Sequence, residues 1–328
     1  MTMKELAKLA GVSPAAVSRY LNGGSLSPQK QAVIRAAIEK TGYQPDAAAQ
    51  MLRTRTTDIV GIIVPKLDSE SVSSVFAGAA EVLAESGYAC QVAVSQNDPE
   101  KELALLSLMQ NRPAAGVILM ATVCSPQHEA ALRGLNIPAV VVGQRYHKVS
   151  CIYHDDYGAM LELARLVLKK GRRRPVYIGA TEQDAAAGIA RRKGVQAAMA
   201  EFGLDPESLP VEISPFEVDG AAAAMERLLA REPELDAVLC ATDRMAIGAM
   251  NVLKQAGRSI GGDVSLAGMG DSWAGRYVTP KLTTAHLYYK TSGESAARRL
   301  VTLMKERGAV QPVYQTMLGY RIQARDSV

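Results

Sequence analysis

The residue types that most often carry out catalysis are sparse in this 328-residue chain, and their spacing does not fit an active site. The chain has no Gly-x-Ser-x-Gly motif and no phosphate-binding loop, and Gly268 and Gly270 lack the third glycine of a dinucleotide loop. Asp155 and Asp156 could form a metal pair, but capping of the helix that follows is the favoured interpretation. The histidines show no metal-ligand spacing; they are His128, His147, His154 and His286. We therefore expect no enzyme, no metal and no cofactor.

The first residues of the chain predict a different chemistry. Thr2 and Glu5 have the spacing of a capping box, and Gly11 can adopt the left-handed conformation that ends a helix. Ser13 and Pro14 then begin a second helix as its cap and first residue. Four residues give the first helix an apolar face: Leu6, Ala7, Leu9 and Ala10. Two helices joined by such a turn form a helix-turn-helix, whose second helix enters the major groove of DNA.

The distribution of charge favours DNA binding over the alternative of a plain helical hairpin. Ser27 and Pro28 predict a third helix over residues 29–40, which completes a small helical head. Residues 1–57 carry a net charge of +5, whereas the whole chain carries +4. All the net positive charge therefore lies on the head, as expected of a module that binds phosphates.

From residue 58 onward, short apolar strands alternate with helices in two successive series. The predicted strands are 59–64, 89–94, 116–120 and 139–142, then 176–179, 211–213, 237–240 and 265–267, with 282–285, 316–318 and 321–324 near the end. The predicted helices are 72–86, 99–110, 126–134, 157–169, 186–202, 220–230 and 244–256, with another from residue 290. This alternation predicts an α/β fold with two doubly wound parallel sheets, which form two lobes.

Several segments resemble the lactose/galactose repressor family of bacterial transcription regulators. They are LAGVS at residues 9–13, VSRYLN at 17–22, GYQP at 42–45 and AAQMLR at 48–53, and the resemblance extends to the C-terminus. It implies a DNA-binding domain at 1–44, a hinge helix or linker at 45–57, and a periplasmic-binding-protein-like domain at 58–328 for effector binding and dimerisation. Lobe 1 is expected at about 58–157 and 288–317, and lobe 2 at about 158–287 and 318–328.

Arg19 is the best candidate for reading a base, because an arginine can donate two hydrogen bonds to guanine. The resemblance also implies a base contact at this position. Ser13 and Ser18 suit phosphate contacts through their hydroxyls and the helix N-terminus. Pro14 and Ala15 occupy positions that set base choice in the family, where they offer only apolar contact. The operator sequence of a relative therefore cannot be transferred to this chain.

The segment after the head is expected to contact the minor groove. The resemblance implies that paired hinge helices of a homodimer enter the minor groove of a palindromic operator, where Leu52 wedges between base pairs. Ala48 and Ala49 would lie near the groove floor, and Asn22 would contact the DNA backbone. A helix this short is marginal alone in water, so a flexible tether remains the alternative.

An effector site is expected between the lobes, since ligands of such sheets bind beyond the carboxyl ends of the strands. The candidates are Asp68, Ser69, Gln144, Arg191, Phe216, Asp243 and Trp273. The resemblance implies that Arg191 and Asp243 bind effector hydroxyls. Phe216 could stack on a sugar ring, as could Trp273, which is expected in a loop; packing is the alternative for both.

Within the family, the strings SRYLNGG, LDSESVSSVFAG, VVVGQR and CIYHDDYGA most resemble sucrose operon repressors. The LDS loop also resembles trehalose repressors, whose effector is a sugar phosphate. Five cations would suit a phosphate: Lys66, Arg145, Arg191, Arg192 and Arg244. Many relatives have a carboxylate where this chain has Gly270, which leaves Asp271 alone. A disaccharide of the sucrose type, or its phosphate, is the expected effector.

The sequence also predicts the cellular location of the protein. The N-terminal MTMKELAKL is no secretory signal, and no apolar run is long enough to span a bilayer. The cysteines lack C-x-x-C spacing and are interpreted as reduced thiols; they are Cys90, Cys124, Cys151 and Cys240. We expect a cytoplasmic bacterial protein, associated with the nucleoid when bound to DNA. A sugar-binding transport protein, the alternative, would need a signal peptide and would lack the basic head.

Overall fold

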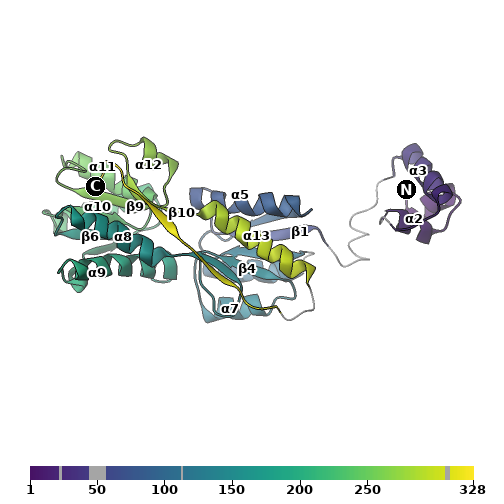
Figure 1. The fold of residues 1–328 in the computed structure, drawn as a ribbon, viewed down its shortest axis with the longest axis horizontal. Helices are drawn as coiled ribbons and strands as arrows, with labels where there is room; N and C mark the ends of the chain where they lie inside the picture. The colour runs from purple at the N-terminus through teal and green to yellow at the C-terminus, as the bar shows by residue number, and fades with distance from the viewer. Residues whose placement is uncertain (22–23, 44–56, 112–113, 307–310) are drawn as a thin grey trace. The chain divides into compact units, whose positions relative to one another are not determined.

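A computed structural model of the chain describes residues 1–21, 24–43, 57–111, 114–306 and 311–328. The chain forms two compact units, Met1–Thr57 and Asp58–Val328 (Figure 1). None of the helices in the described ranges is long and apolar enough to cross a membrane.

The described residues of the first unit form three helices, α1 (Met3–Leu9), α2 (Pro14–Leu21) and α3 (Pro28–Thr41). The capping box is confirmed, because the Thr2 N–H donates to Glu5 and the Glu5 N–H donates to the Thr2 hydroxyl. Gly11 has the predicted left-handed conformation, with φ of +65°. Leu9 is 51% exposed, so its expected place on the buried face of α1 is wrong. The core of the head is instead made of Leu6, Ala7, Val17, Ile34 and Ala37.

The second unit has two six-stranded sheets, which confirms the predicted fold class. The sheet of lobe 1 has the order β11-β5-β4-β3-β1-β2, and every pairing in it is parallel. Its strands are β1 (Ile59–Val64), β2 (Ala89–Val94), β3 (Gly116–Met120), β4 (Ala139–Val142), β5 (Cys151–His154) and β11 (Gln315–Leu318).

The sheet of lobe 2 has the order β12-β10-β9-β8-β6-β7, and β12 alone among these strands is antiparallel to its neighbour. Its strands are β6 (Pro175–Gly179), β7 (Val211–Ile213), β8 (Ala237–Cys240), β9 (Ser265–Met269), β10 (Thr283–Leu287) and β12 (Tyr320–Gln323). Strands β6 to β9 are apolar and buried, as expected for a sheet covered on both faces, except for β7 at the edge.

Helices cover both faces of each sheet. In lobe 1, α5 (Glu70–Glu85) and α13 (Tyr289–Lys305) pack on one face, and α6 (Pro99–Asn111) and α7 (Pro126–Arg133) pack on the other. A hydrophobic cluster lies on each face of this sheet. Alternate residues of β1 point to opposite faces, so Ile62 belongs to the cluster under α5 and α13, and Ile63 to the cluster under α6 and α7. The helices of lobe 2 are α8 (Asp156–Lys169), α9 (Arg191–Glu201), α10 (Val218–Arg231), α11 (Asp243–Gln255) and α12 (Trp273–Tyr277).

Helices α5 and α13 lie side by side and approach each other through a pair of glycines (Figure 1). A Cβ atom on Gly293 would lie 1.9 Å from the carbonyl oxygen of Val75. A Cβ atom on Gly78 would lie 2.1 Å from the carbonyl oxygen of Lys290. The two backbones are therefore in direct contact, which only glycine permits at these positions.

Three crossings join the lobes, at Asp155 after β5, at Tyr288 after β10, and at Gly319 between β11 and β12. Strand β5 was not predicted, because its four residues include a tyrosine and a histidine that weaken its apolar pattern. The predicted loop position of Trp273 is wrong, because this residue begins α12 after the Ser272 cap. The predicted helix over 186–202 is a π-helix at Ala185–Ala190 followed by α9.

Candidate DNA-binding face and effector site

One face of α2 is exposed and carries the residues predicted to read DNA. Pro14, Ala15 and Arg19 are exposed, whereas Ala16 and Val17 are buried against the other helices of the head. Arg19 lies four residues after Ala15, so both lie on the same face of the helix. The geometry leaves the Arg19 guanidinium available to a ligand outside the head.

The start of α2 is fixed by its cap. The Ser13 hydroxyl accepts a hydrogen bond from the Ala16 N–H at 3.2 Å, and Ser18 is partly buried one turn further on. The Arg35 Nε donates to the Tyr20 hydroxyl at 3.4 Å, which links α3 to α2. The other two helices of the head, α1 and α3, carry exposed cations: Lys4, Lys8, Lys30, Arg35 and Lys40. Four other predicted DNA contacts lie outside the described residues: Asn22, Ala48, Ala49 and Leu52.

The loop after β1 contacts lobe 2. Asp68 accepts a hydrogen bond from Arg244 at 3.0 Å, and this bond lowers the pKa of the Asp68 carboxyl. The Lys66 Nζ donates to the backbone carbonyl of Phe216 at 3.4 Å. Both carboxylate oxygens of Glu70 accept from the backbone N–H of Trp273 at 3.1 Å. The carboxyl end of β1 therefore faces loops that belong to the other lobe.

The loop after β4 makes a second contact between the lobes. Gln144 is only 3% exposed, and its Nε2 donates to the Asp184 Oδ1 at 2.8 Å. The same carboxylate oxygen accepts the N–H groups of Ala186 and Ala187, so Asp184 caps the π-helix. Burial raises the pKa of Asp184. Asp184 was not among the predicted site residues, although its place directly before an alanine run is typical of a helix cap.

Arg191 is buried at the start of α9, where it forms an ion pair with Asp156 at 2.6 Å. Its Nη1 also donates to the carbonyl of Ala241 at 2.5 Å. Burial opposes the charged form, but the Asp156 carboxylate keeps the pKa of Arg191 above its ordinary value. The prediction that both aspartates cap α8 is only half right: Asp155 accepts the Gly158 N–H, whereas Asp156 pairs with Arg191.

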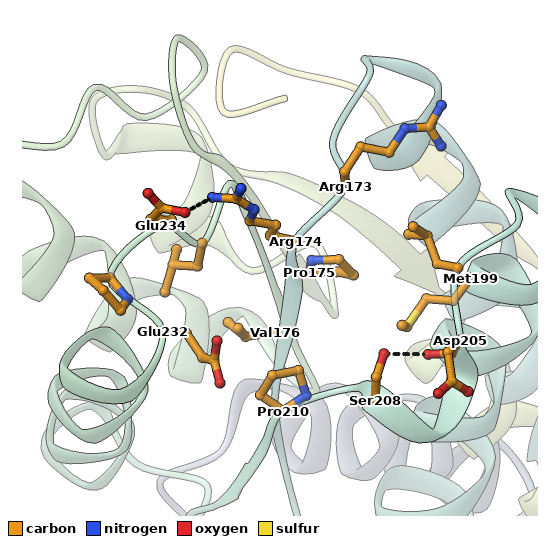
Figure 2. A pocket seen from close by; sticks show the side chains of 13 residues that line it. Arg173, Arg174, Pro175, Val176, Met199, Asp205, Ser208, Pro210, Glu232 and Glu234 are labelled. Atoms are coloured by element: carbon orange, nitrogen blue, oxygen red, sulfur yellow. Dashed lines mark hydrogen bonds and ion pairs between the residues drawn. The ribbon is translucent and has the colours of Figure 1, made fainter.

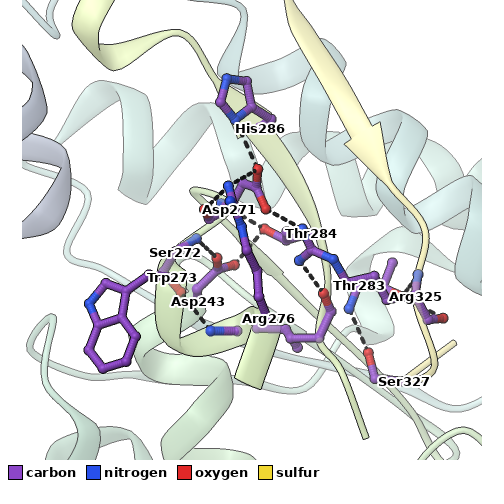
Figure 3. A network of polar contacts seen from close by, with 12 residues as sticks. Asp243, Asp271, Ser272, Trp273, Arg276, Thr283, Thr284, His286, Arg325 and Ser327 are labelled. Atoms are coloured by element: carbon purple, nitrogen blue, oxygen red, sulfur yellow. Dashed lines mark hydrogen bonds and ion pairs between the residues drawn. The ribbon is translucent and has the colours of Figure 1, made fainter. Parts of the chain in front are cut away.

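Asp243 is 2% exposed at the start of α11, inside a network of polar contacts (Figure 3). It accepts hydrogen bonds from the Thr284 hydroxyl at 2.5 Å and from the Ser272 N–H at 2.6 Å. Burial raises the pKa of Asp243 to about 6 despite these bonds. A ligand hydroxyl at Asp243 would have to share the oxygens that these two groups already occupy.

Asp271 is held entirely by neighbouring side chains (Figure 3). Its carboxylate pairs with Arg325, with Arg276 at 2.8 Å, and with His286 Nδ1 at 3.1 Å. Burial acts against its charge, but the bonds from the two arginines lower the pKa of Asp271. Its φ of +53° turns the chain after Gly270, a conformation that aspartate tolerates better than most residues. Asp271 therefore anchors the C-terminal segment in lobe 2.

The remaining candidates contact the site mainly through their backbone or through local bonds. Trp273 is 65% exposed, and Phe216 packs partly against the core of lobe 2. Ser69 shares a hydrogen bond with Ser71 at 2.9 Å. The seven candidates thus come from both lobes, and four of them take part in contacts across the boundary: Asp68, Gln144, Phe216 and Trp273.

A pocket of about 410 Å³ lies elsewhere in lobe 2 (Figure 2). It is lined by the residues that precede β6, β7 and β8, including Arg174, Pro210 and Leu235, and so lies at the amino ends of these strands. Arg174 forms an ion pair with Glu234 there, and the Ser208 hydroxyl donates to the Asp205 carbonyl. None of the seven effector candidates lines this pocket.

Comparison with known proteins identifies the family. A model of bacterial regulatory proteins of the lacI family matches residues 2–46, and a periplasmic binding protein-like domain matches residues 164–328. The transcriptional regulator GalR of Escherichia coli (strain K12) is 31% identical over 312 residues, which cover 93% of this chain and 90% of GalR. The chain belongs to the LacI family. It is therefore a DNA-binding transcription regulator, and the resemblance drawn from the sequence is confirmed.

Two further proteins are similar to this LacI-family chain. The sucrose operon repressor of Staphylococcus xylosus is 28% identical over 303 residues, which cover 92% of this chain and 93% of that protein. The structure of a complex of the regulator CelR with cellobiose superimposes with a TM-score of 0.76 and 26% identity, and covers 100% of both chains.

Proposed function

We propose that this LacI-family protein represses a carbohydrate-utilisation operon, and that a sugar bound between its lobes controls its affinity for operator DNA. The observation that supports this most directly is the meeting of the two lobes at their strand ends. Asp68 and Gln144 of lobe 1 reach Arg244 and Asp184 of lobe 2 there. The carboxyl ends of parallel strands are where such sheets bind ligands.

The DNA-binding part of the proposal rests on the exposed face of α2. A homodimer would place two such helices on the half-sites of a palindromic operator, with Arg19 at the bases and the cations of the head at the phosphates. The protein would regulate by binding DNA and sugar, without catalysing a reaction. It would act in the cytoplasm, where its operator lies. The hinge role of Leu52, Ala48 and Ala49, and the backbone contact of Asn22, belong to this proposal and rest on the sequence.

The sugar would act by favouring one arrangement of the lobes. It can shift the equilibrium only by its difference in affinity for the two arrangements, and a change from 1:99 to 99:1 needs about 5.5 kcal/mol. The three crossings at Asp155, Tyr288 and Gly319 are the places where the lobes can rotate relative to each other. We expect sugar binding to release the protein from DNA, because this direction of control suits an operon for sugar breakdown.

Sucrose is the first effector to test, because several segments resemble sucrose operon repressors and one such repressor is a relative. Arg191 and Asp243 are the proposed contacts to its hydroxyls, with Trp273 and Phe216 as stacking partners. A regulator that responds to trehalose or its phosphate is the second candidate, favoured by the loop that contains Asp68 and Ser69.

The DNA part of the proposal can be tested with Arg19→Ala and Arg19→Lys, using operators selected from random duplexes by the purified protein. We expect Arg19→Ala to lose about 1–3 kcal/mol of base discrimination, and Arg19→Lys to keep affinity for non-specific DNA while losing part of the selectivity. Lys8→Ala is the control and should weaken binding to all sequences alike. Retention of full selectivity by Arg19→Ala would overturn the assignment of α2 as the reading helix.

A further inference from the structure

Each of the five cations that the sequence offers for a phosphate already has a partner, and two of them, Lys66 and Arg244, make contacts across the boundary between the lobes. Arg191 pairs with Asp156, and Arg192 pairs with Glu182, each at 2.6 Å. Arg244 pairs with Asp68 at 3.0 Å. Three positive charges are thus matched one to one by carboxylates.

The other two cations are also engaged. Arg145 donates from Nε to the Gln315 side-chain oxygen at 3.1 Å, and its guanidinium lies 5.8 Å from the ring centre of Tyr153. Lys66 donates to the Phe216 carbonyl at 3.4 Å. Arg191 is the most fully engaged of the five, because it donates to Asp156 and to the Ala241 carbonyl. A phosphate at Arg191 would have to displace Asp156 and leave that buried carboxylate without its cation.

The same boundary holds three more carboxylates, whose hydrogen-bond donors are neutral groups. Glu70 accepts from the Trp273 N–H, and Asp184 accepts from the Gln144 amide. Asp243 accepts from the Thr284 hydroxyl and the Ser272 N–H. A sugar hydroxyl can donate to such oxygens, whereas a phosphate dianion has only acceptor oxygens and would be repelled by them.

We infer that the effector is an uncharged saccharide, and that Asp68 and Asp156 exclude its phosphate ester by neutralising Arg244 and Arg191. This inference rests on the proposed function, since it concerns the ligand of the same site. It narrows the alternatives left by the sequence, which offered both a disaccharide and a sugar phosphate. The contacts favour hydroxyl donors over anionic groups at the place where the lobes meet.

The test is titration calorimetry of the full-length protein at pH 7.5 with three matched pairs: sucrose, trehalose and cellobiose, each with its 6-phosphate. We expect at least one uncharged sugar to bind, and to bind about 10-fold or more tightly than its own phosphate. Tighter or equal binding of a phosphate ester would overturn the inference and leave the proposed function standing. If none of the six compounds binds, the proposed carbohydrate control fails, and the inference fails with it.

The role of Asp68 can be tested separately with Asp68→Asn, which frees Arg244 while preserving the size of the side chain. For each pair we compare the dissociation constant of the phosphate with that of its sugar. We expect the ratio of these two constants to be about 3-fold or more smaller in this variant than in the parent. Glu234→Gln is the matched control, because it frees Arg174 by the same change of charge at the far end of lobe 2. An unchanged ratio in Asp68→Asn would contradict the excluding role of Asp68, as would an equal narrowing in Glu234→Gln.

Discussion

The Glu102 Oε2 and the His128 Nε2 lie 3.4 Å apart inside lobe 1, where both side chains are almost completely buried. The other oxygen of Glu102 accepts two hydrogen bonds from Thr122, through its N–H and its hydroxyl, each at 3.1 Å. The Nδ1 of His128 lies 2.8 Å from the Ser125 hydroxyl. Thr122 lies two residues after the end of β3, and its carbonyl accepts from Gln144, so the pair is linked to the boundary between the lobes.

This pair predicts a specific dependence of stability on pH. Burial raises the pKa of Glu102 from 4.5 to about 7, and the nearby Asp184 adds to the effect. Folding therefore favours the protonated acid, so the contribution of Glu102 to stability is fully present below pH 4.5 and is lost as the pH rises to about 7. Glu102→Gln is neutral at every pH and does not suffer this loss. We therefore expect its free energy of unfolding, relative to that of the parent, to rise by about 3 kcal/mol from pH 5 to pH 8.

Urea unfolding followed by circular dichroism at pH 5 and pH 8 would measure this difference. Burial lowers the pKa of His128, so its own contribution has the opposite sign: it is fully present above pH 6.5 and is lost as the pH falls below 6.5 through the lowered pKa. The double variant Glu102→Gln/His128→Gln removes both titrations and should show the flattest profile of the set. Glu226→Gln, on the exposed face of α10, is the control. The difference in free energy of unfolding between Glu102→Gln and the parent should change across this range. The same difference at pH 5 and pH 8 would contradict the raised pKa of Glu102.

The ion pair between Arg191 and Asp156 predicts a large loss of stability when one partner is removed. Asp156→Asn would leave a buried guanidinium without its counter-charge, which costs about 3–5 kcal/mol in comparable pairs. Asp156→Asn/Arg191→Met removes both charges and should recover part of this loss. Glu234→Gln disrupts an exposed pair and should change stability by less than about 1 kcal/mol. Equal urea midpoints for Asp156→Asn and Glu234→Gln would show that the buried pair does not stabilise the fold.

Much of the fold could be predicted because its signals are local. The buried strands read as short apolar runs, and β1, β2, β3 and β4 have the predicted bounds. The caps at Thr2 and Ser13 were also visible, since each requires only a polar residue at a fixed offset. Strand β5 could not be predicted from local signals. It has only four residues and pairs with β4 on one side and β11 on the other, so its structure depends on segments distant in the sequence.

The site could be predicted only in part, because the sequence shows which polar residues follow a strand and not which of them meet. Arg191 is a predicted site residue, but the sequence did not indicate its partner Asp156, which lies 35 residues away along the chain and was interpreted as a cap. Asp271 was interpreted as a free carboxylate, yet Arg325 reaches it from the C-terminal segment. Such pairings depend on the topology of lobe 2, which brings the end of the chain next to β9 and β10.

The glycine contact between α5 and α13 predicts that Gly293→Ala will destabilise lobe 1. Its new methyl group would lie 1.9 Å from the Val75 carbonyl oxygen, and a backbone atom cannot move aside as a side-chain end can. The helices would have to separate, and overpacking of this kind typically costs about 1–3 kcal/mol. Alanine also favours the helix intrinsically by about 1 kcal/mol, so the steric cost has to exceed that gain.

Gly319→Ala provides the control for this variant, because a Cβ atom there has no neighbour within 4 Å. We expect the urea midpoint of Gly319→Ala to match the parent, and that of Gly293→Ala to fall. Gly78→Ala should resemble Gly293→Ala, since its methyl group would meet the Lys290 carbonyl oxygen at 2.1 Å. The two substitutions act on one helix contact, so their double variant should lose less stability than the sum of the single losses. Strict additivity would mean that α5 and α13 do not separate as a unit, and unchanged midpoints in both single variants would contradict the close approach itself.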